Sequence, residues 1–194
     1  MTTRLLLVSP AVTASARSGV FDDGASLDSA GAAQARRAAG TLPLADRVVV
    51  SPGTRCAQTA DALGLNAGQA APALAGLDAG SWRGRSLDDV SATEPQAVAR
   101  WLTDPEASPP GGESVADVCA RVGRWLDEVR EGGTASGRVV AVVEPEVVRA
   151  AAVHATGAPL SAFWRLDVAP LSATEFSGRS GRWNIRLGRM LGAE

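Results

Sequence analysis

The sequence has no lysine and no tyrosine, and all 19 of its basic residues are arginine. We attribute this to coding bias and not to function. With 21 acidic residues the formal net charge is −2, so the chain lacks the positive excess that binds nucleic acid or an anionic membrane surface. No run approaches the ~18 apolar residues of a membrane span, and the run before Ser9 is too short for a secretory signal. We therefore expect a cytoplasmic protein without nucleic-acid or membrane partners.

Cysteine and histidine are also scarce. Cys56 and Cys119 have no Cys-x-x-Cys spacing and no histidines around them, so we expect two reduced, mostly buried thiols and neither a metal site nor another cofactor. His154 is the only histidine, and its place midway along a predicted helix favours a structural role. Without a histidine partner for Ser9 or Ser51, a Ser-His-Asp triad is excluded.

Three short apolar runs, at residues 5–8, 47–50 and 138–143, are typical of strands buried on both faces of a parallel sheet. Helix signals follow each run, at residues 26–42, 53–65 and 145–157. The pattern predicts an α/β fold in three layers, with a mostly parallel central sheet flanked by helices. The length of 194 residues is compatible with a single domain spanning residues 1–194.

The remaining segments are less regular. Residues 113–131 carry apolar side chains at spacings of three and four, which predicts a strongly amphipathic helix. The proline- and glycine-rich stretch 102–114 indicates a surface loop, and residues 163–188 indicate short strands with a hairpin at 177–181. No internal repeat or low-complexity tract is present.

In a parallel sheet the carboxyl ends of the strands meet at one edge, and ligands bind outside those ends. We therefore expect three strand tips to converge, at residues 9–11, 51–55 and 144–145. Glu144 is the candidate catalytic residue. The candidate pocket residues at or beside these tips are Ser9, Pro10, Thr13, Ser51, Arg55 and Pro145, and Asp78, Trp82 and Arg83 are further candidates.

Several of these residues have a simpler interpretation. Ser9, Thr13 and Ser51 could donate hydrogen bonds into a pocket, but such residues also cap helices. Packing under a loop is the favoured role for Trp82, and exposure to solvent is favoured for Arg83. Whether the peptide bonds preceding Pro10 and Pro145 are cis is left open.

Six motifs occur in the order and spacing of one known family. The motifs are LLLVSPAVT, SLDSAGAAQA, VVVSPGTRCAQTA, LAGLDAGSWRGRSL, PPGGES and VVAVVEPEVVRAAA. On these motifs the chain resembles the histidine phosphatase superfamily, the phosphoglycerate-mutase-like phosphatases, over nearly its whole length. The resemblance implies a phosphoglycerate-mutase-like three-layer fold.

The resemblance also implies which positions would carry the family's chemistry, and most of them differ here. The family's Arg-His-Gly, which contains the nucleophilic histidine, corresponds to Ser9, Pro10 and Ala11. The family's acid corresponds to Gly76, a position near which Asp78 and Trp82 lie in the sequence. Its second active-site His-Gly pair corresponds to Glu144 and Pro145. Only the phosphate-binding arginine of the second strand is retained, as Arg55.

A proline has no lone pair with which to attack phosphorus, and loss of a nucleophile typically removes several orders of magnitude in rate. A carboxylate at position 144 would also repel a phosphate dianion by several kcal/mol at an effective dielectric of ~20. For Glu144 itself, three interpretations stay open. It forms a structural ion pair with Arg55, or acts as a general base or anchor for a neutral or cationic small molecule, or has no role.

Three functional hypotheses follow. The first is a pseudophosphatase that serves as a binding or interaction module without turnover. The second is an enzyme of altered, non-phosphatase chemistry in a specialised bacterial pathway, with Glu144 as general base or acid. The third is residual phosphatase activity. A homodimer is compatible with each of them.

Overall fold

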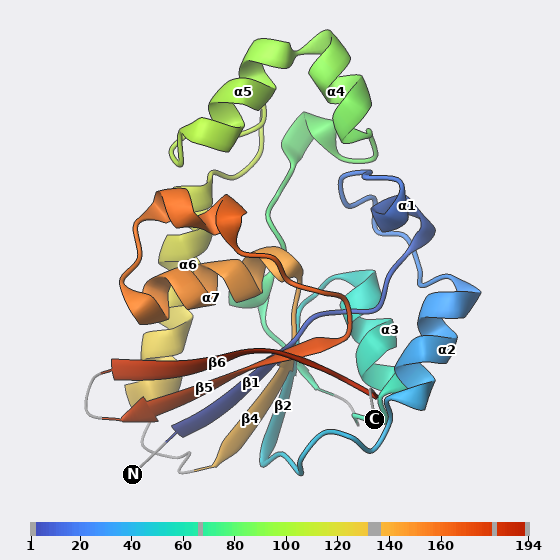
Figure 1. Ribbon diagram of the computed structural model, residues 1–194, viewed down its shortest axis with the longest axis vertical. Coiled ribbons are helices and arrows are strands. Elements are labelled where there is room, and N and C mark those ends of the chain that lie inside the picture. Colours follow the sequence, from blue (N-terminus) through green and yellow to red (C-terminus); the bar gives the residue numbers. More distant parts are fainter. Residues whose placement is uncertain (1–2, 66–67, 132–136, 180–181, 193–194) are drawn as a thin grey trace.

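The computed structural model describes residues 3–65, 68–131, 137–179 and 182–192, and its centre is a twisted six-stranded sheet (Figure 1). The strand order is β3-β2-β4-β1-β5-β6. The strands are β1 Thr3–Val8, β2 Arg47–Val50, β3 Gln69–Ala70, β4 Arg138–Val142, β5 Ser172–Arg179 and β6 Arg182–Met190. The predicted strands at 5–8, 47–50 and 138–143 correspond to β1, β2 and β4, with ends that differ by no more than two residues.

The inner part of the sheet is parallel, and its last two strands are antiparallel. β4 pairs in parallel with both β1 and β2, and β3 pairs in parallel with β2. β5 runs antiparallel to β1, and β6 runs antiparallel to β5. The predicted α/β architecture with a mostly parallel sheet is confirmed.

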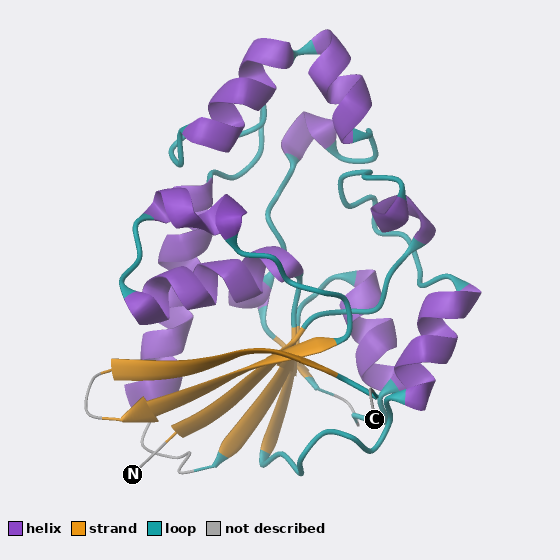
Figure 2. Ribbon diagram, in the orientation of Figure 1, coloured by secondary structure: helices purple, strands orange, loops and turns teal. Residues whose placement is uncertain are grey.

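Helices cover the sheet from both sides (Figure 2). α6 Val115–Glu131 and α7 Pro145–Thr156 pack on the face that carries Leu5 and Leu7, whereas α2 Ser29–Arg37 and α3 Thr54–Ala62 pack on the face with Leu6 and Val8. Because successive strand side chains point to opposite faces, a strand covered on both sides must be apolar throughout. This explains the continuous apolar runs in the sequence.

Local signals set the ends of these helices. Pro145 occupies the first turn of α7, and Gly157 ends it with a positive φ of 65°. The predicted helix at 26–42 is shorter in the structure, because the Asp28 carboxylate caps α2 by accepting a hydrogen bond from Gly31 N at 2.6 Å. α3 likewise ends at Ala62, before Gly64 with a φ of 74°.

A helical cap lies beyond the carboxyl ends of the strands, at the top of Figure 1, and the sequence analysis did not predict it. It contains α4 Leu87–Thr93 and α5 Pro95–Thr103, with the short α1 Ala14–Arg17 near it. The local signals were present, since Ser86 caps α4 and Pro95 opens α5. Short 3-10 helices were missed as well, at η1 Pro72–Leu74, η2 Gly80–Trp82 and η3 Leu160–Arg165.

The predicted hairpin near the end of the chain is formed by β5 and β6, which are longer than expected. Pairing continues to Arg179 opposite Arg182, so residues 177–179 belong to a strand and not to a turn. Residues 180–181 of the predicted turn lie outside the described residues. Within the described ranges, no helix combines the length and apolar character needed to cross a bilayer.

Candidate functional site

The three strand tips lie side by side, as expected from the parallel topology. Ser51 N donates a hydrogen bond to Val142 O at 2.9 Å, and Val143 N donates to Val8 O at 2.9 Å. Backbone pairing therefore continues past the ends of β1, β2 and β4. This brings residues 9–11, 51–55 and 144–145 to one edge of the sheet.

Glu144 is the central side chain of this edge, and it is buried, with 3% of its surface exposed. Arg55 Nε donates to Glu144 Oε2 at 2.7 Å, and Arg55 Nη2 forms an ion pair with the same oxygen. The Cys56 thiol donates to the other oxygen, Oε1, at 3.3 Å. Both carboxylate oxygens are thus engaged by two consecutive residues in the first turn of α3.

Electrostatics and burial act against each other in this pair. Burial raises the pKa of Glu144, and the hydrogen bond and charge of Arg55 oppose that shift. Burial would lower the pKa of Arg55, but the hydrogen bond and charge of Glu144 raise it above its ordinary value. Burial, and then the Glu144 charge, raise the pKa of the Cys56 thiol well above its ordinary value, so the thiol stays protonated and can donate.

Two glycines make room for the Glu144 side chain. A Cβ added at Gly53 would lie 2.9 Å from Glu144 Oε1, and one added at Gly76 would lie 3.0 Å from Glu144 Cγ. Both distances are shorter than an ordinary van der Waals contact. The buried carboxylate therefore depends on the absence of side chains at these two positions.

Arg121 holds the segment that contains Gly76. Its guanidinium donates to Ala73 O at 2.9 Å and to Gly76 O at 3.0 Å, and it is paired with Glu113 at 2.6 Å. The sequence analysis did not single out Arg121, Cys56 or Gly53. Only the position of Cys56 next to Arg55 could have indicated its contact, because the other interactions join distant parts of the chain.

A steric test of this arrangement is the Gly76→Ala variant. Since Gly76 does not need a positive φ, the backbone tolerates alanine, and the added Cβ should press on Glu144 alone. We expect a loss of about 1–2 kcal/mol in the free energy of unfolding, measured by urea denaturation. In a Glu144→Ala background the same change should have almost no effect. An equal loss in both backgrounds would show that the contact with Glu144 is not the cause.

Three other predicted pocket residues have structural contacts. The Ser9 hydroxyl donates to Ala169 O and accepts from Ser172 N at 3.2 Å, so it ties β1 to the segment before β5. The Thr13 hydroxyl caps α1 by accepting from Ala16 N at 3.0 Å. Pro10 is buried, and the described residues contain no cis peptide bond, so the bonds before Pro10 and Pro145 are trans.

The remaining predicted pocket residues are Asp78, Trp82 and Arg83, which come shortly after Gly76 in the chain. Trp82 is fully buried, packs against Phe21 and Trp101, and donates from Nε1 to Glu94 at 3.1 Å. It therefore belongs to the interior of the cap, as its loop-packing interpretation predicted. Asp78 and Arg83 are exposed, and the Asp78 carboxylate accepts from Gly80 N at 3.0 Å within its own loop.

His154 is not part of the strand-tip site. Its Nε2 lies 3.3 Å from Asp127 Oδ1, and its ring lies against Gly123, so it contacts α6 from α7. Across the described ranges, no three His, Cys, Asp or Glu side chains gather closely enough to hold a metal ion.

Comparison with known proteins gives the family. A model described as histidine phosphatase superfamily (branch 1) matches residues 13–189. The chain belongs to the histidine phosphatase superfamily. The matched residues begin at Thr13, just after the Ser9, Pro10 and Ala11 of the first strand tip.

Solved structures of two phosphatases share the fold over almost the whole chain. Mycobacterial glucosyl-3-phosphoglycerate phosphatase Rv2419c aligns with a TM-score of 0.85 at 24% identity and covers 100% of both chains. The α-ribazole phosphatase of Shigella flexneri aligns with a TM-score of 0.85 at 21% identity, over 98% of this chain and 99% of that one. These likenesses show the phosphoglycerate-mutase-like fold.

Curated relatives match shorter stretches. The bifunctional protein Rv2228c of Mycobacterium tuberculosis is 34% identical over 117 residues, which are 59% of this chain and 31% of the relative. Phosphoserine phosphatase 1 of Hydrogenobacter thermophilus is 35% identical over 89 residues, which are 45% of this chain and 42% of the relative. The match thus spans less than half the length of either relative.

Proposed function

We propose that this chain is a pseudophosphatase, a member of the histidine phosphatase superfamily that does not hydrolyse phosphate esters and serves as a binding or interaction module. The observation that carries the proposal is the buried ion pair between Arg55 and Glu144. Arg55 is the one phosphate-binding position of the family motif retained in the sequence. Its guanidinium is occupied by a carboxylate of the same molecule.

The carboxylate acts against phosphate in two ways. Glu144 occupies hydrogen-bond donors that a phosphate group would need, and its negative charge would repel a dianion at the same place. To bind phosphate, the protein would have to move Glu144 away from Arg55 and leave the carboxylate buried without its partner. Such a buried, unpaired charge is strongly unfavourable.

The positions around the pair support the same proposal. Pro10 stands at the position that the resemblance gives to the nucleophile, and the single histidine of the chain contacts α6 instead. Gly76 stands at the position of the family's acid, where a Cβ would already crowd Glu144. The replacements at positions 76 and 144 are therefore sterically compatible with each other, and a glutamate at 76 would not be.

For a ligand, we propose a neutral or cationic small molecule or a protein partner that binds at this edge of the sheet. A general-base role for Glu144 has less support, because both of its oxygens already accept hydrogen bonds. Residual phosphatase activity stays as the alternative, and it is favoured by the retained Arg55 and by the phosphatases among the relatives.

Hydrolysis assays decide between the two. We expect the purified protein to release no phosphate above background from para-nitrophenyl phosphate, phosphoserine or glucosyl-3-phosphoglycerate. The Pro10→His variant should remain inactive because it lacks the acid, with Pro10→Ala as its matched control. Turnover by the wild-type protein that disappears in an Arg55→Ala variant shown to be folded would overturn the proposal.

The binding role is tested separately with a metabolite extract of the native host. Untargeted mass spectrometry compares the extract before and after incubation, together with small molecules released from the denatured protein. A retained neutral or cationic compound is expected, without conversion of any metabolite. If one metabolite disappears while another accumulates, and Glu144→Gln stops the change, the protein is an enzyme of altered chemistry that uses this site.

A further inference from the structure

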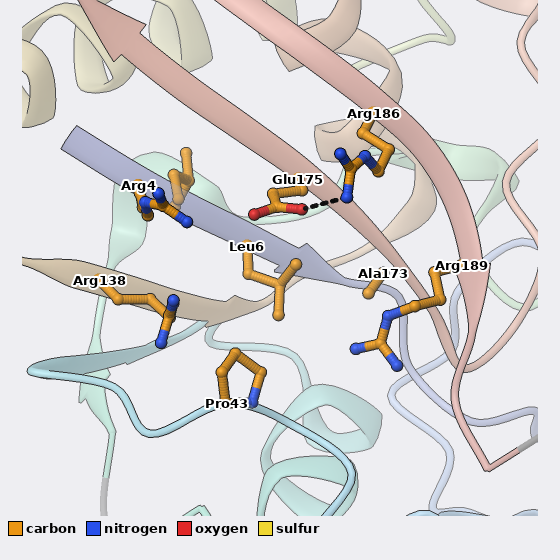
Figure 3. Close-up of a pocket in the computed structure, with 9 residues that line it drawn as sticks. Arg4, Leu6, Pro43, Arg138, Ala173, Glu175, Arg186 and Arg189 are labelled. Atoms are coloured by element: carbon orange, nitrogen blue, oxygen red, sulfur yellow. Dashed lines mark ion pairs between the residues drawn. The ribbon is translucent and has the colours of Figure 1, made fainter. Parts of the chain in front are cut away.

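A second pocket lies on the sheet face, apart from the strand tips, and arginines surround it (Figure 3). It is a cavity of about 100 Å³ whose lining does not include Glu144 or Arg55. Its lining residues come from β1, β4, β5, β6 and the connection between α2 and β2. They are Arg4, Leu5, Leu6, Pro43, Arg138, Ala173, Glu175, Arg186 and Arg189.

The strand register explains why these arginines share one face. Arg4 is directly opposite Arg138 in the β1–β4 pair. Arg186 is opposite Glu175 and Arg189 is opposite Ala173 in the β5–β6 pair. Residues that pair across strands point to the same face of a sheet, so all four guanidinium groups lie on the side of Leu6. α2 and α3 cover only the part of this face nearer the strand tips (Figure 1).

The charges of this pocket are not balanced. Its four arginines face one carboxylate, Glu175, which pairs with Arg186 at 3.7 Å. Arg138 Nη1 donates to a neutral partner, Leu44 O, at 3.1 Å. In the described part of the chain, the guanidinium groups of Arg4 and Arg189 have no carboxylate partner. A local excess of three positive charges therefore occurs in a protein whose net charge is −2.

An anion bound among these mostly exposed arginines would offset their mutual repulsion. Like charges directly opposite each other in a sheet destabilise it, and Arg4 and Arg138 form such a pair. Guanidinium groups are also the side chains best suited to hold phosphate, since their parallel N–H donors match two of its oxygens. The floor formed by Leu6, Pro43 and Ala173 supplies no competing negative charge (Figure 3).

We propose that this pocket binds a phosphate group, either as inorganic phosphate or as the head group of a small phosphorylated molecule. The volume of about 100 Å³ accommodates several waters or one phosphate group, and the remainder of a larger ligand would extend through the open mouth. The site is separate from the strand-tip site. It does not depend on whether the protein is a pseudophosphatase.

The test is isothermal titration calorimetry of the full chain with inorganic phosphate, pyrophosphate and glycerol phosphate at low ionic strength. We expect saturable binding at one site per chain, weakened at least 10-fold by Arg4→Gln and by Arg189→Gln. Arg124→Gln is the matched control, because it removes one exposed guanidinium from α6, on the opposite face of the sheet. Tighter binding of glycerol phosphate than of inorganic phosphate would identify a phosphorylated molecule as the ligand.

Thermal unfolding gives an independent readout that also checks folding. In phosphate-free buffer Arg4→Gln should unfold at the same or a higher temperature than the wild type, since it removes a like-charge contact. Phosphate should raise the Tm of the wild type and of Arg124→Gln but not that of Arg4→Gln. Absence of saturable binding, an equal loss in Arg124→Gln, or unchanged affinity in both pocket variants would overturn the proposal. The last result would place phosphate elsewhere, for example at the strand tips.

Discussion

Replacing Arg55 with alanine is expected to lower the free energy of unfolding by about 3–5 kcal/mol, because it leaves the buried carboxylate of Glu144 without its partner. Urea denaturation at neutral pH measures the loss. Arg100→Ala is the matched control, since Arg100 also pairs with a carboxylate, Asp104, but the pair is exposed. Breaking that exposed pair should change stability by less than about 0.5 kcal/mol.

The double variant Arg55→Met with Glu144→Leu separates the stability of the pair from the cost of breaking it. Apolar residues of similar volume often replace a buried ion pair without loss, so this variant should regain most of the stability lost in Arg55→Ala. It would show that the pair specifies the shape and charge of the site more than it stabilises the fold. A double variant no more stable than Arg55→Ala would show that the unpaired carboxylate of Glu144 is not the cause of the loss in Arg55→Ala.

The second large effect is a loss of stability at alkaline pH that arises from the two thiols. Burial raises the pKa of Cys119 to about 11, and the pKa of Cys56 is raised well above its ordinary value by burial and by Glu144. The unfolded chain releases these protons near pH 8.5. Between that pH and about 11 the folded protein holds more protons than the unfolded chain, so stability falls as the pH rises.

The absence of lysine and tyrosine makes this effect unusually easy to isolate. Arginine does not titrate below about pH 12, so the thiols are the only side chains that change charge between about pH 8.5 and 11. We expect Cys119 alone to contribute a loss of up to about 2 kcal/mol by the upper end of that range. Urea midpoints of the reduced protein at increasing pH measure the slope.

The cysteine variants provide the control. Cys119→Ala should make the slope shallower, and Cys56→Ala with Cys119→Ala should remove it, whatever their effect on stability at neutral pH. If the stability of the wild-type protein is constant over this pH range, folding does not raise the pKa of the two thiols as described.

Much of the fold could be predicted from the sequence, for physical reasons that the strands and α7 illustrate. Apolar runs at 5–8, 47–50 and 138–143 predicted the central strands, because burial on both faces demands side chains of that type at every position. Pro145 and Gly157 marked the ends of α7, because their backbone preferences are properties of single residues. The cap formed by α4 and α5 was not predicted, because helices of 7 and 9 residues are too short to show a long repeating pattern of apolar residues.

The candidate site was predictable in its location but not in its contacts. Parallel topology by itself placed residues 9–11, 51–55 and 144–145 at one edge. Trp82 was a candidate because it lies near the position of the family's acid, with packing under a loop as its favoured role, and it packs in the interior of the cap. Cys56 as a donor to Glu144, and Arg121 as the residue that holds the Gly76 segment, were not foreseen.

The sequence by itself determined the central strands and the helices that follow them. It also determined that His154 is the only histidine, that every basic residue is arginine and that the net charge is −2. These are local or compositional properties. Only the tertiary structure decided that Glu144 pairs with Arg55, 89 residues away, and that Arg4 and Arg138 meet arginines of β6 on one face. Such contacts depend on strand register and on which helix packs at which strand tip, and those are settled by the packing of the whole chain.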